Sequence, residues 1–179
     1  MLEMRINGYG GQGSVTLAHL LAEAALVNGK KGQALPFFGV ERRGAHVRAS
    51  VRISPDAIHA YSRCEEPDVA VVMSEKLVPA ARAEGIKAGG FFVVNAPHTV
   101  AVDGYAVWRV DADAIAVQAG LLSASGPFIN VPLFGALCKV LGLSESVLEK
   151  TILQKWPGSR GEQNVKAAKA AYAAVQKDN

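Results

Sequence analysis

The chain contains few cysteines and few aromatic residues, and it lacks a long continuous apolar run. Only Cys64 and Cys138 are cysteines among 179 residues, and neither has a Cys-x-x-Cys partner. This spacing argues against a zinc or iron–sulfur site built by this chain alone and favours two buried free thiols. No stretch approaches the roughly 20 apolar residues of a membrane helix, and no secretory leader is visible. We therefore expect a cytoplasmic protein without membrane contact.

The charge of the chain is also modest. The formal net charge is +3, and Lys and Arg are not clustered with interleaved aromatic residues, which argues against nucleic-acid binding. Half of the residues are hydrophobic and 20% are charged, a balance typical of a globular protein with a sizeable core. Length and composition together predict one domain over residues 1–179, with a helical C-terminal third.

Apolar patterning divides the chain into alternating strands and helices. A period of two or a short unbroken apolar run indicates a strand, whereas apolar residues three and four positions apart indicate a helix. The sequence predicts strands over residues 3–8, 33–38, 47–53, 69–73, 91–95 and 105–110, with a short partner strand or edge over 57–61. It predicts helices over residues 14–28, 74–84, 111–119, 131–141, 145–154 (capped by Ser144) and 164–177, with a loop over 156–164.

This order of elements predicts an α/β fold. We expect an open, mostly parallel, Rossmann-like sheet with helices on both faces and an antiparallel edge or insertion around residues 45–61. In the strand over 47–53, apolar residues alternate with Arg48, Ser50 and Arg52. That alternation predicts a strand with one wet or charge-lined face.

A glycine-rich loop follows the first predicted strand. Gly8-Tyr9-Gly10-Gly11-Gln12-Gly13 fits the pattern G-x-G-x-x-G, and a helix is predicted directly after it. Backbone N–H groups of such a loop, together with the helix N-terminus, can hold a phosphate, a pyrophosphate or a carboxylate. The candidate anion-binding residues are Gly10, Gly11, Gln12, Gly13 and Ser14. The alternative is that the glycines only permit a tight turn between strand and helix.

A dinucleotide site needs a further residue that this chain lacks. An Asp or Glu should follow the glycine loop by about 20 residues and bind the ribose hydroxyl. Residues 28–36 read NGKKGQALP, and no acid appears until Glu41. Lys30 and Lys31 lie before the second strand and not at its end. The sequence therefore disfavours NAD(P) or FAD, and a stand-alone protein binding one of them is kept as the alternative function.

The turn Glu41-Arg42-Arg43-Gly44 is a second candidate ligand or interface element. Two arginines beside a carboxylate can make bidentate, charge-assisted contacts with phosphates or carboxylates. From the residues alone, a surface salt-bridge turn is the favoured interpretation. His46 follows the turn and is, of the four histidines, the best candidate for contact with a ligand. No nucleophile–base pair is evident, so we expect no catalytic residue in this chain.

Several motifs together resemble the γ subunit of the 2-oxoacid:ferredoxin oxidoreductases, a family that includes the pyruvate, 2-oxoisovalerate, indolepyruvate and phenylglyoxylate enzymes. The stretches GYGGQGSVTLAHLLAEA and GVERRGAHVRASVRIS carry the resemblance. Pro67-Asp68, Gly89-Gly90, the run NVPLFGAL from Asn130, and the helix at Asn164 extend it over nearly the whole chain. The family usually has two glycines after the arginine, whereas this chain has Gly44-Ala45.

The resemblance implies a subunit of a thiamine-diphosphate-dependent complex that oxidises a 2-oxoacid to an acyl-CoA. Thiamine diphosphate, Mg and [4Fe–4S] clusters would be held by other subunits (α, β and a ferredoxin-like δ), and this chain alone would bind no cofactor. Electrons would go to ferredoxin, or to NAD through a further subunit. This chain would be scaffold and part of the CoA or substrate access wall. The resemblance gives a ligand or interface role to Glu41, Arg42, Arg43, Gly44, His46 and Asn130.

Overall fold

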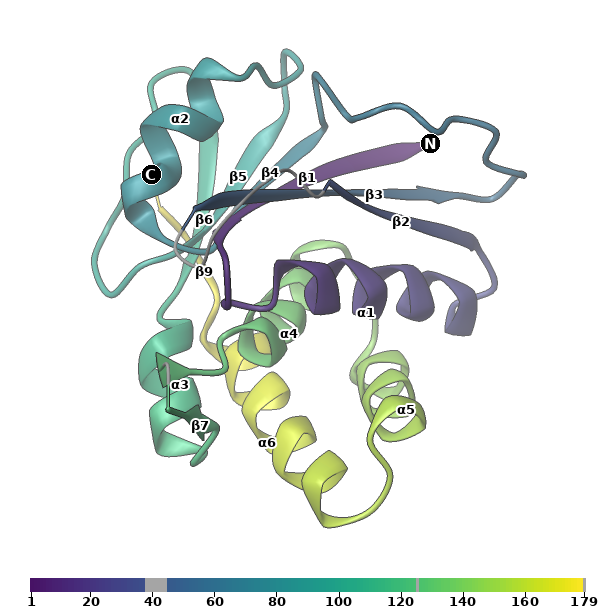
Figure 1. Cartoon of the computed structure of the whole chain (residues 1–179), viewed down its shortest axis with the longest axis vertical. Coiled ribbons are helices and arrows are strands. Elements are labelled where there is room, and N and C mark those ends of the chain that lie inside the picture. Colours follow the sequence, from purple (N-terminus) through teal and green to yellow (C-terminus); the bar gives the residue numbers. More distant parts are fainter. Residues whose placement is uncertain (38–44, 125, 179) are drawn as a thin grey trace.

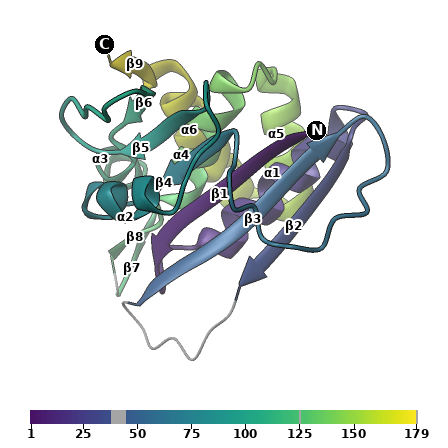
Figure 2. The same cartoon turned by 90° about the horizontal axis from the view of Figure 1, so that it is seen from above.

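The computed structural model describes residues 1–37, 45–124 and 126–178. Its main element is a seven-stranded sheet of order β2-β3-β1-β4-β5-β6-β9 (Figures 1 and 2). The strands are β1 (Leu2–Tyr9), β2 (Lys31–Phe37), β3 (His46–Ser54), β4 (Val69–Val72), β5 (Phe91–Asn95), β6 (Ala106–Val110) and β9 (Gln176–Asp178). Strands β1, β4, β5 and β6 are parallel, and β3, β2 and β9 each pair antiparallel with a neighbour. The predicted α/β sheet with an antiparallel edge is confirmed.

Helices cover the two faces of the sheet unequally. One face carries α1 (Ser14–Val27), α3 (Ala112–Gln118), α4 (Asn130–Val140), α5 (Glu145–Lys155) and α6 (Ser159–Ala174). The other face carries the 3₁₀ turn η1 (Glu75–Leu77) and the short helix α2 (Val78–Ala83) (Figure 1). Two antiparallel strands of two residues each, β7 (Leu122–Ser123) and β8 (Gly126–Pro127), form a short hairpin after α3. Among the described residues, no helix is long and apolar enough to cross a membrane.

The central strand β4 shows why unbroken apolar runs appear in the sequence. Val69 and Val71 pack into the larger core, on the side of α1 and α4. Ala70 and Val72 pack into the smaller core, under α2. Because successive side chains point to opposite faces, a strand covered on both sides must be apolar at every position.

The face of β3 that carries Arg48, Ser50 and Arg52 is charge-lined, as one form of the prediction has it, but it is largely covered rather than wet. Arg52 is only 2% exposed, and its guanidinium donates to Glu3 Oε1 at 2.9 Å and to the Ala60 carbonyl at 3.3 Å. The predicted strand over 57–61 is wrong, because no strand forms there. The segment instead contributes a backbone carbonyl to Arg52, and the nearby Cys64 N–H donates to the Ser50 hydroxyl at 3.0 Å.

The C-terminal segment differs from the prediction at both of its ends. Helix α6 begins at Ser159, within the predicted loop, because Gly158 adopts a positive φ of 77° at its N-cap. The helix ends at Ala174, and β9 then pairs with β6. Asp178 fixes this edge, since its carboxylate accepts from Arg109 Nε at 3.0 Å and from the Val100 N–H at 2.9 Å.

The glycine loop lies where the chain changes from one face of the sheet to the other. Helix α1 follows β1 and covers one face, whereas α2 follows the adjacent β4 and covers the opposite face (Figure 1). In open α/β sheets, ligands bind at this switch point, at the carboxyl ends of the strands. The fold therefore places the loop where a ligand cavity is expected.

Candidate functional site

The glycine loop is closed on itself by its own hydrogen bonds. Gln12 Oε1 accepts from the Tyr9 N–H at 2.7 Å, and the Gln12 N–H donates to the Tyr9 carbonyl at 3.1 Å. The Gly10 N–H donates to the Ala45 carbonyl at 3.0 Å, which ties the loop to the beginning of β3. Gly11 and Gly13 have φ values of 99° and 83°, a region that favours glycine. The Gln12 side chain thus shapes the loop.

The Ser14 side chain faces the core. Its hydroxyl donates to Met73 Sδ at 3.2 Å, and a Cβ on Gly8 would overlap that hydroxyl. Ser14 is buried and does not line the cavities described below. Gly8 therefore permits close packing of the strand against the helix, and Ser14 presents its backbone at the first turn of α1.

A cavity of about 530 Å³ lies against the glycine loop. Its polar part is formed by the loop, the beginning of α1, and residues of α4 and α6. Its apolar part comes from the segment after α3 and from the residue that follows α5. The lining residues are Gly11, Gly13, Thr16, Gly120, Leu121, Leu122, Phe128, Asn130, Val131, Trp156, Arg160, Gln163 and Asn164.

Two buried asparagines line this cavity, and the amide oxygen of one of them has no hydrogen-bond partner within the described chain. Asn130 is 7% exposed and Asn164 is 5% exposed. Asn130 Oδ1 is fully buried and has no hydrogen-bond partner among the described residues. Because buried polar side chains are normally hydrogen-bonded, the unpartnered Asn130 Oδ1 favours a polar ligand at the cavity.

Three helices begin at the cavity, and none is capped by a side chain. Helices α1, α4 and α6 have no side-chain hydrogen bond at their N-caps, and residues of their first two turns line the cavity. Helices α3 and α5 are instead capped by Asp111, which accepts from Ala114 N–H, and by Ser144, which accepts from Val147 N–H. Uncapped N-termini carry free N–H donors and partial positive charge. Together with Arg160, they favour an anion at this cavity.

A smaller cavity of about 270 Å³ lies against Gly10, Gly11 and Gln12. Asp113, at the first turn of α3, contributes a carboxylate to it. That carboxylate accepts from Asn95 Nδ2 at 2.7 Å, and Asn95 also binds the Met73 carbonyl and the Ala112 N–H. The negative charge makes this cavity less suited to an anion than the larger one. Asn95 fixes the position of α3 relative to the ends of β4 and β5.

His46 belongs to a different cluster, on the opposite side of β1. Its Nε2 lies 3.2 Å from Asn7 Oδ1, and its Nδ1 lies 4.0 Å from Glu84 Oε1. Glu84 also pairs with Arg48 and, at 3.3 Å, with Arg5 Nε. Partial burial acts to raise the pKa of Glu84, but the hydrogen bond and charge of Arg48 and the charge of Arg5 outweigh it and lower that pKa.

Arg5 gives this cluster a structural role. Its guanidinium donates to the Ala81 carbonyl at 2.9 Å and to the Gly85 carbonyl at 2.7 Å, at the end of α2. The cluster therefore joins β1 and β3 to α2, and His46 does not line the cavity at the glycine loop.

The structure thus brings together Gly11, Gly13 and Asn130, which the sequence had singled out. Glu41, Arg42, Arg43 and Gly44 lie outside the described residues. Arg160, Gln163 and a binding role for Asn164 are not evident from the sequence patterns. The available signal is the polar beginning of α6, over which the sequence predicts a loop.

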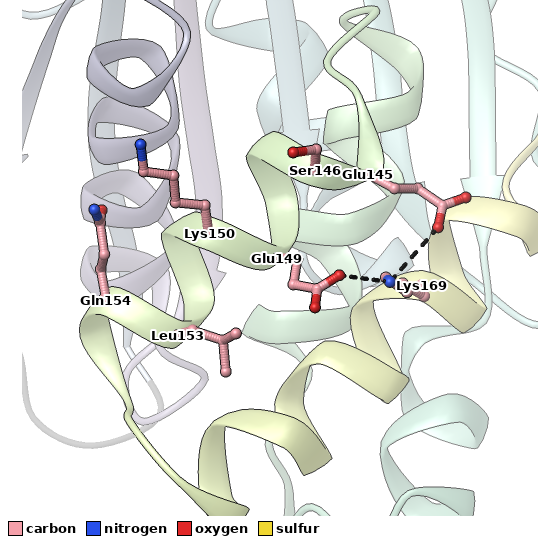
Figure 3. A pocket seen from close by; sticks show the side chains of 7 residues that line it. All are labelled: Glu145, Ser146, Glu149, Lys150, Leu153, Gln154 and Lys169. Atoms are coloured by element: carbon pink, nitrogen blue, oxygen red, sulfur yellow. Dashed lines mark hydrogen bonds and ion pairs between the residues drawn. The ribbon is translucent and has the colours of Figure 1, made fainter.

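A wide groove of about 710 Å³ between α5 and α6 is a weaker candidate (Figure 3). Three of its charged side chains pair with one another, since Lys169 Nζ lies 2.7 Å from Glu149 Oε2 and 4.0 Å from Glu145 Oε2. It is lined by exposed helix flanks and no glycine loop. Over residues 1–37, 45–124 and 126–178, no group of three or more His, Cys, Asp or Glu could hold a metal ion.

The sequence matches the family described as pyruvate ferredoxin/flavodoxin oxidoreductase over residues 3–174. The chain belongs to this family. Within the family, it is 40% identical over 174 residues to the pyruvate synthase subunit PorC of Methanothermobacter marburgensis, with 96% of each chain covered. It is 40% identical over 183 residues to the common γ subunit of the pyruvate/ketoisovalerate oxidoreductases of Thermococcus litoralis, again with 96% of each chain covered.

Two solved structures share the fold of this chain. Pyruvate oxidoreductase subunit PORC of Thermotoga maritima matches with a TM-score of 0.84 and 33% identity, covering 99% of this chain and 98% of that chain. The 2-oxoglutarate:ferredoxin oxidoreductase of Magnetococcus marinus, solved with 2-oxoglutarate, coenzyme A and succinyl-CoA, shares the fold. Its TM-score is 0.79 at 21% identity, over 99% of this chain and 32% of that chain. The present family member is a γ subunit of a multisubunit 2-oxoacid:ferredoxin oxidoreductase, and the stand-alone NAD(P)- or FAD-binding alternative is not favoured.

Proposed function

We propose that this γ subunit contributes a binding wall for coenzyme A, at the cavity beside the glycine loop, in a complex that converts a 2-oxoacid to an acyl-CoA. The observation that carries the proposal is the convergence of three helix N-termini without side-chain caps and the unpartnered Asn130 Oδ1 on one cavity of about 530 Å³. The cavity is within the size range of small-molecule sites.

The chemistry of the cavity matches the groups that coenzyme A carries. Phosphates suit the helix N-termini and Arg160. The buried Asn130 Oδ1 can accept from an amide N–H or from the amino group of adenine. Phe128 and Trp156 supply aromatic surface on the apolar side, against which a base or an alkyl segment can pack.

Other subunits are proposed to hold the redox machinery. Cys64 and Cys138 are both buried free thiols, so they are poor ligands for an iron–sulfur cluster. We propose that the α, β and ferredoxin-like δ subunits hold the [4Fe–4S] clusters, together with the thiamine diphosphate and Mg that the family resemblance implies. Ferredoxin, or NAD through a further subunit, would take the electrons, and the complex would work in the cytoplasm. Pyruvate and ketoisovalerate, named for the relatives, are the first 2-oxoacids to test.

The assembled complex provides the test, because CoA would also contact other subunits. Asn130→Leu and Arg160→Gln in this chain are expected to raise the KM for CoA about tenfold each, a loss of about 1.4 kcal/mol in binding. The KM for the 2-oxoacid should stay unchanged. Lys150→Gln, in the groove between α5 and α6, is the matched control for Arg160→Gln. It also removes one positive charge, but Lys150 does not line the cavity.

Two results would overturn the proposal. One is an unchanged KM for CoA in both variants while the complex remains assembled. The other is binding of NAD(H) by the isolated chain, measured by calorimetry, if Arg160→Gln weakens that binding. This result would favour the alternative that the cavity binds a dinucleotide.

A further inference from the structure

A cavity of about 440 Å³ lies on the side of the sheet that carries α2. Residues directly opposite each other on neighbouring strands share a face, and so do residues two apart on one strand. The pairs Arg5–Ser50 and Phe37–Arg48 therefore place four of its lining side chains together. The other lining residues are Arg63, Cys64, Glu65 and Glu84. We call this space the arginine cavity, and it shares no lining residue with the cavity at the glycine loop.

Arg5 brings an unused hydrogen-bond donor to the arginine cavity. The residue is only 5% exposed, and its two Nη atoms donate to backbone carbonyls, among them those of Ala81 and Gly85. Its Nε makes no hydrogen bond within the described chain, although Glu84 Oε2 lies 3.3 Å away as an ion-pair partner. A buried donor on a charged group is costly to leave without an acceptor, so Arg5 Nε favours an acceptor in the cavity.

Two further donors line the arginine cavity. Ser50 is 2% exposed, and its hydroxyl accepts from the Cys64 N–H at 3.0 Å, which leaves the Ser50 O–H available to donate. The Arg63 guanidinium lies 5.0 Å from the centroid of the Phe37 ring and has no ion pair in the described structure. An aromatic ring, and not a carboxylate, therefore holds this positive charge at the cavity.

Positive charge exceeds negative charge along the walls of the arginine cavity. Arg5, Arg48 and Arg63 line it, against the two acids Glu65 and Glu84. Glu84 is shared, because it pairs with both Arg5 and Arg48. Glu65 is exposed, and its backbone carbonyl is the group that accepts from Arg5, at 2.8 Å. The surplus of guanidinium groups favours an anion over a cation or a neutral molecule.

We propose that the arginine cavity binds the carboxylate or phosphate group of a small organic anion. Guanidinium groups and a hydroxyl are donors that suit the oxygens of both groups, and the planar guanidinium can meet two oxygens at once. Phe37 and Cys64 supply apolar surface for the carbon part of the molecule. The site is separate from the cavity proposed for CoA, and the inference does not depend on CoA binding.

Calorimetry of the full chain tests the site with two probes, pyruvate for a carboxylate and inorganic phosphate for a phosphate group. Every titration uses a chain that carries Arg160→Gln, because this substitution weakens the glycine-loop cavity as a second candidate for anion binding. We expect at least one probe to bind with a Kd of about 1 mM or below. Adding Arg63→Gln should raise that Kd at least about tenfold, since a charge-assisted contact is lost.

Two further variants sharpen the comparison. Ser50→Ala should also raise the Kd, and because Arg63 is exposed, Arg63→Gln decides the test if Ser50→Ala does not fold. Arg82→Gln is the matched control, since Arg82 is exposed on α2 and lines neither cavity. Circular dichroism shows which variants are folded.

The outcomes separate this inference from the CoA proposal. The probe whose binding Arg63→Gln weakens identifies the group that the arginine cavity takes. If neither probe binds up to about 20 mM, or if Arg63→Gln and Arg82→Gln weaken binding equally, the inference is overturned. Neither result bears on the CoA wall, because Arg160 is replaced in every chain titrated and the CoA wall is tested by the KM for CoA.

Discussion

Asn130 and Gly13 are in such close contact that a Cβ on Gly13 would press against the Asn130 side chain. A Cβ built on Gly13 would lie 3.0 Å from both Cγ and Nδ2 of Asn130. Gly13 is the N-cap of α1, and Asn130 is the first residue of α4. The glycine therefore allows two helix N-termini to approach each other at the cavity, and this close approach brings the asparagine amide to the loop.

The contact predicts that Gly13→Ala lowers the free energy of unfolding more than the same substitution at Gly29, a glycine of similar φ. Gly13 has a φ of 83° and Gly29 a φ of 74°, so alanine is strained at both by about 1–2 kcal/mol. Nothing lies within 4 Å of a Cβ on Gly29. We expect Gly13→Ala to lower the free energy of unfolding by about 1 kcal/mol more than Gly29→Ala, as measured by urea denaturation. Equal losses would contradict the contact.

Asn130→Leu should separate stability from binding. The buried Asn130 Oδ1 has no partner in the described chain, so its desolvation is uncompensated when no ligand is present. Replacing the amide by an apolar group of similar size should leave the melting temperature unchanged or raise it. The same variant is expected to bind CoA more weakly. A clear drop in melting temperature would mean that the amide is satisfied within the protein.

Glu84→Gln should lower stability in a pH-dependent way. Burial acts to raise the pKa of Glu84, but Arg48 and Arg5 lower it below the ordinary value of 4.5. The stability from the ionised carboxylate is therefore fully present above about pH 4.5. It is lost as the pH falls through the lowered pKa of the folded state. At pH 7 the variant should be about 1–2 kcal/mol less stable than the wild type, with the gap closing in acid.

Denaturant titrations at a series of pH values measure this gap. Glu66→Gln is the control, because Glu66 is exposed and has no ion pair in the described structure. A gap that stays constant from neutral to strongly acidic pH would show that the Glu84 charge does not provide the stabilisation.

Both cysteines should be unreactive in the folded chain. Cys64 is 3% exposed and Cys138 is fully buried, and burial raises the pKa of each thiol. A thiol reagent at pH 8 is therefore expected to titrate no cysteine in the native protein and both in guanidinium chloride. Rapid modification of the native chain, or the absence of free thiol after denaturation without reductant, would contradict this.

Local sequence patterns predicted the strands that are buried on both faces and a helix cap formed by residues close in sequence. Strands β4 and β5 appeared as unbroken apolar runs because their two faces pack into the two hydrophobic cores. The cap at Ser144 was also predictable, since its hydroxyl accepts from the Val147 N–H three residues later at 3.3 Å. Such features depend on residues close in sequence or on burial alone.

Features that depend on distant partners were missed. Strand β9 is polar, and the pairing with β6 and the Asp178–Arg109 ion pair that fix it span about 70 residues. Arg52 looked solvent-exposed because Glu3 and the Ala60 carbonyl, which satisfy it, are not adjacent in sequence. For the same reason, only part of the cavity was predicted. Sequence motifs indicate the glycine loop and Asn130, whereas Arg160 lies beside them only because α6 packs against α4.

The hydrogen bonds between Gln12 and Tyr9 have a consequence for the energetics of the loop. The loop is already fixed at both ends, by Gln12 within it and by the Ala45 carbonyl outside it. A ligand at the cavity would therefore not have to order the loop, and little conformational entropy would be lost there on binding. The affinity would depend on how well a rigid surface matches the ligand, so closely related ligands would be discriminated by shape more than by adaptation of the backbone.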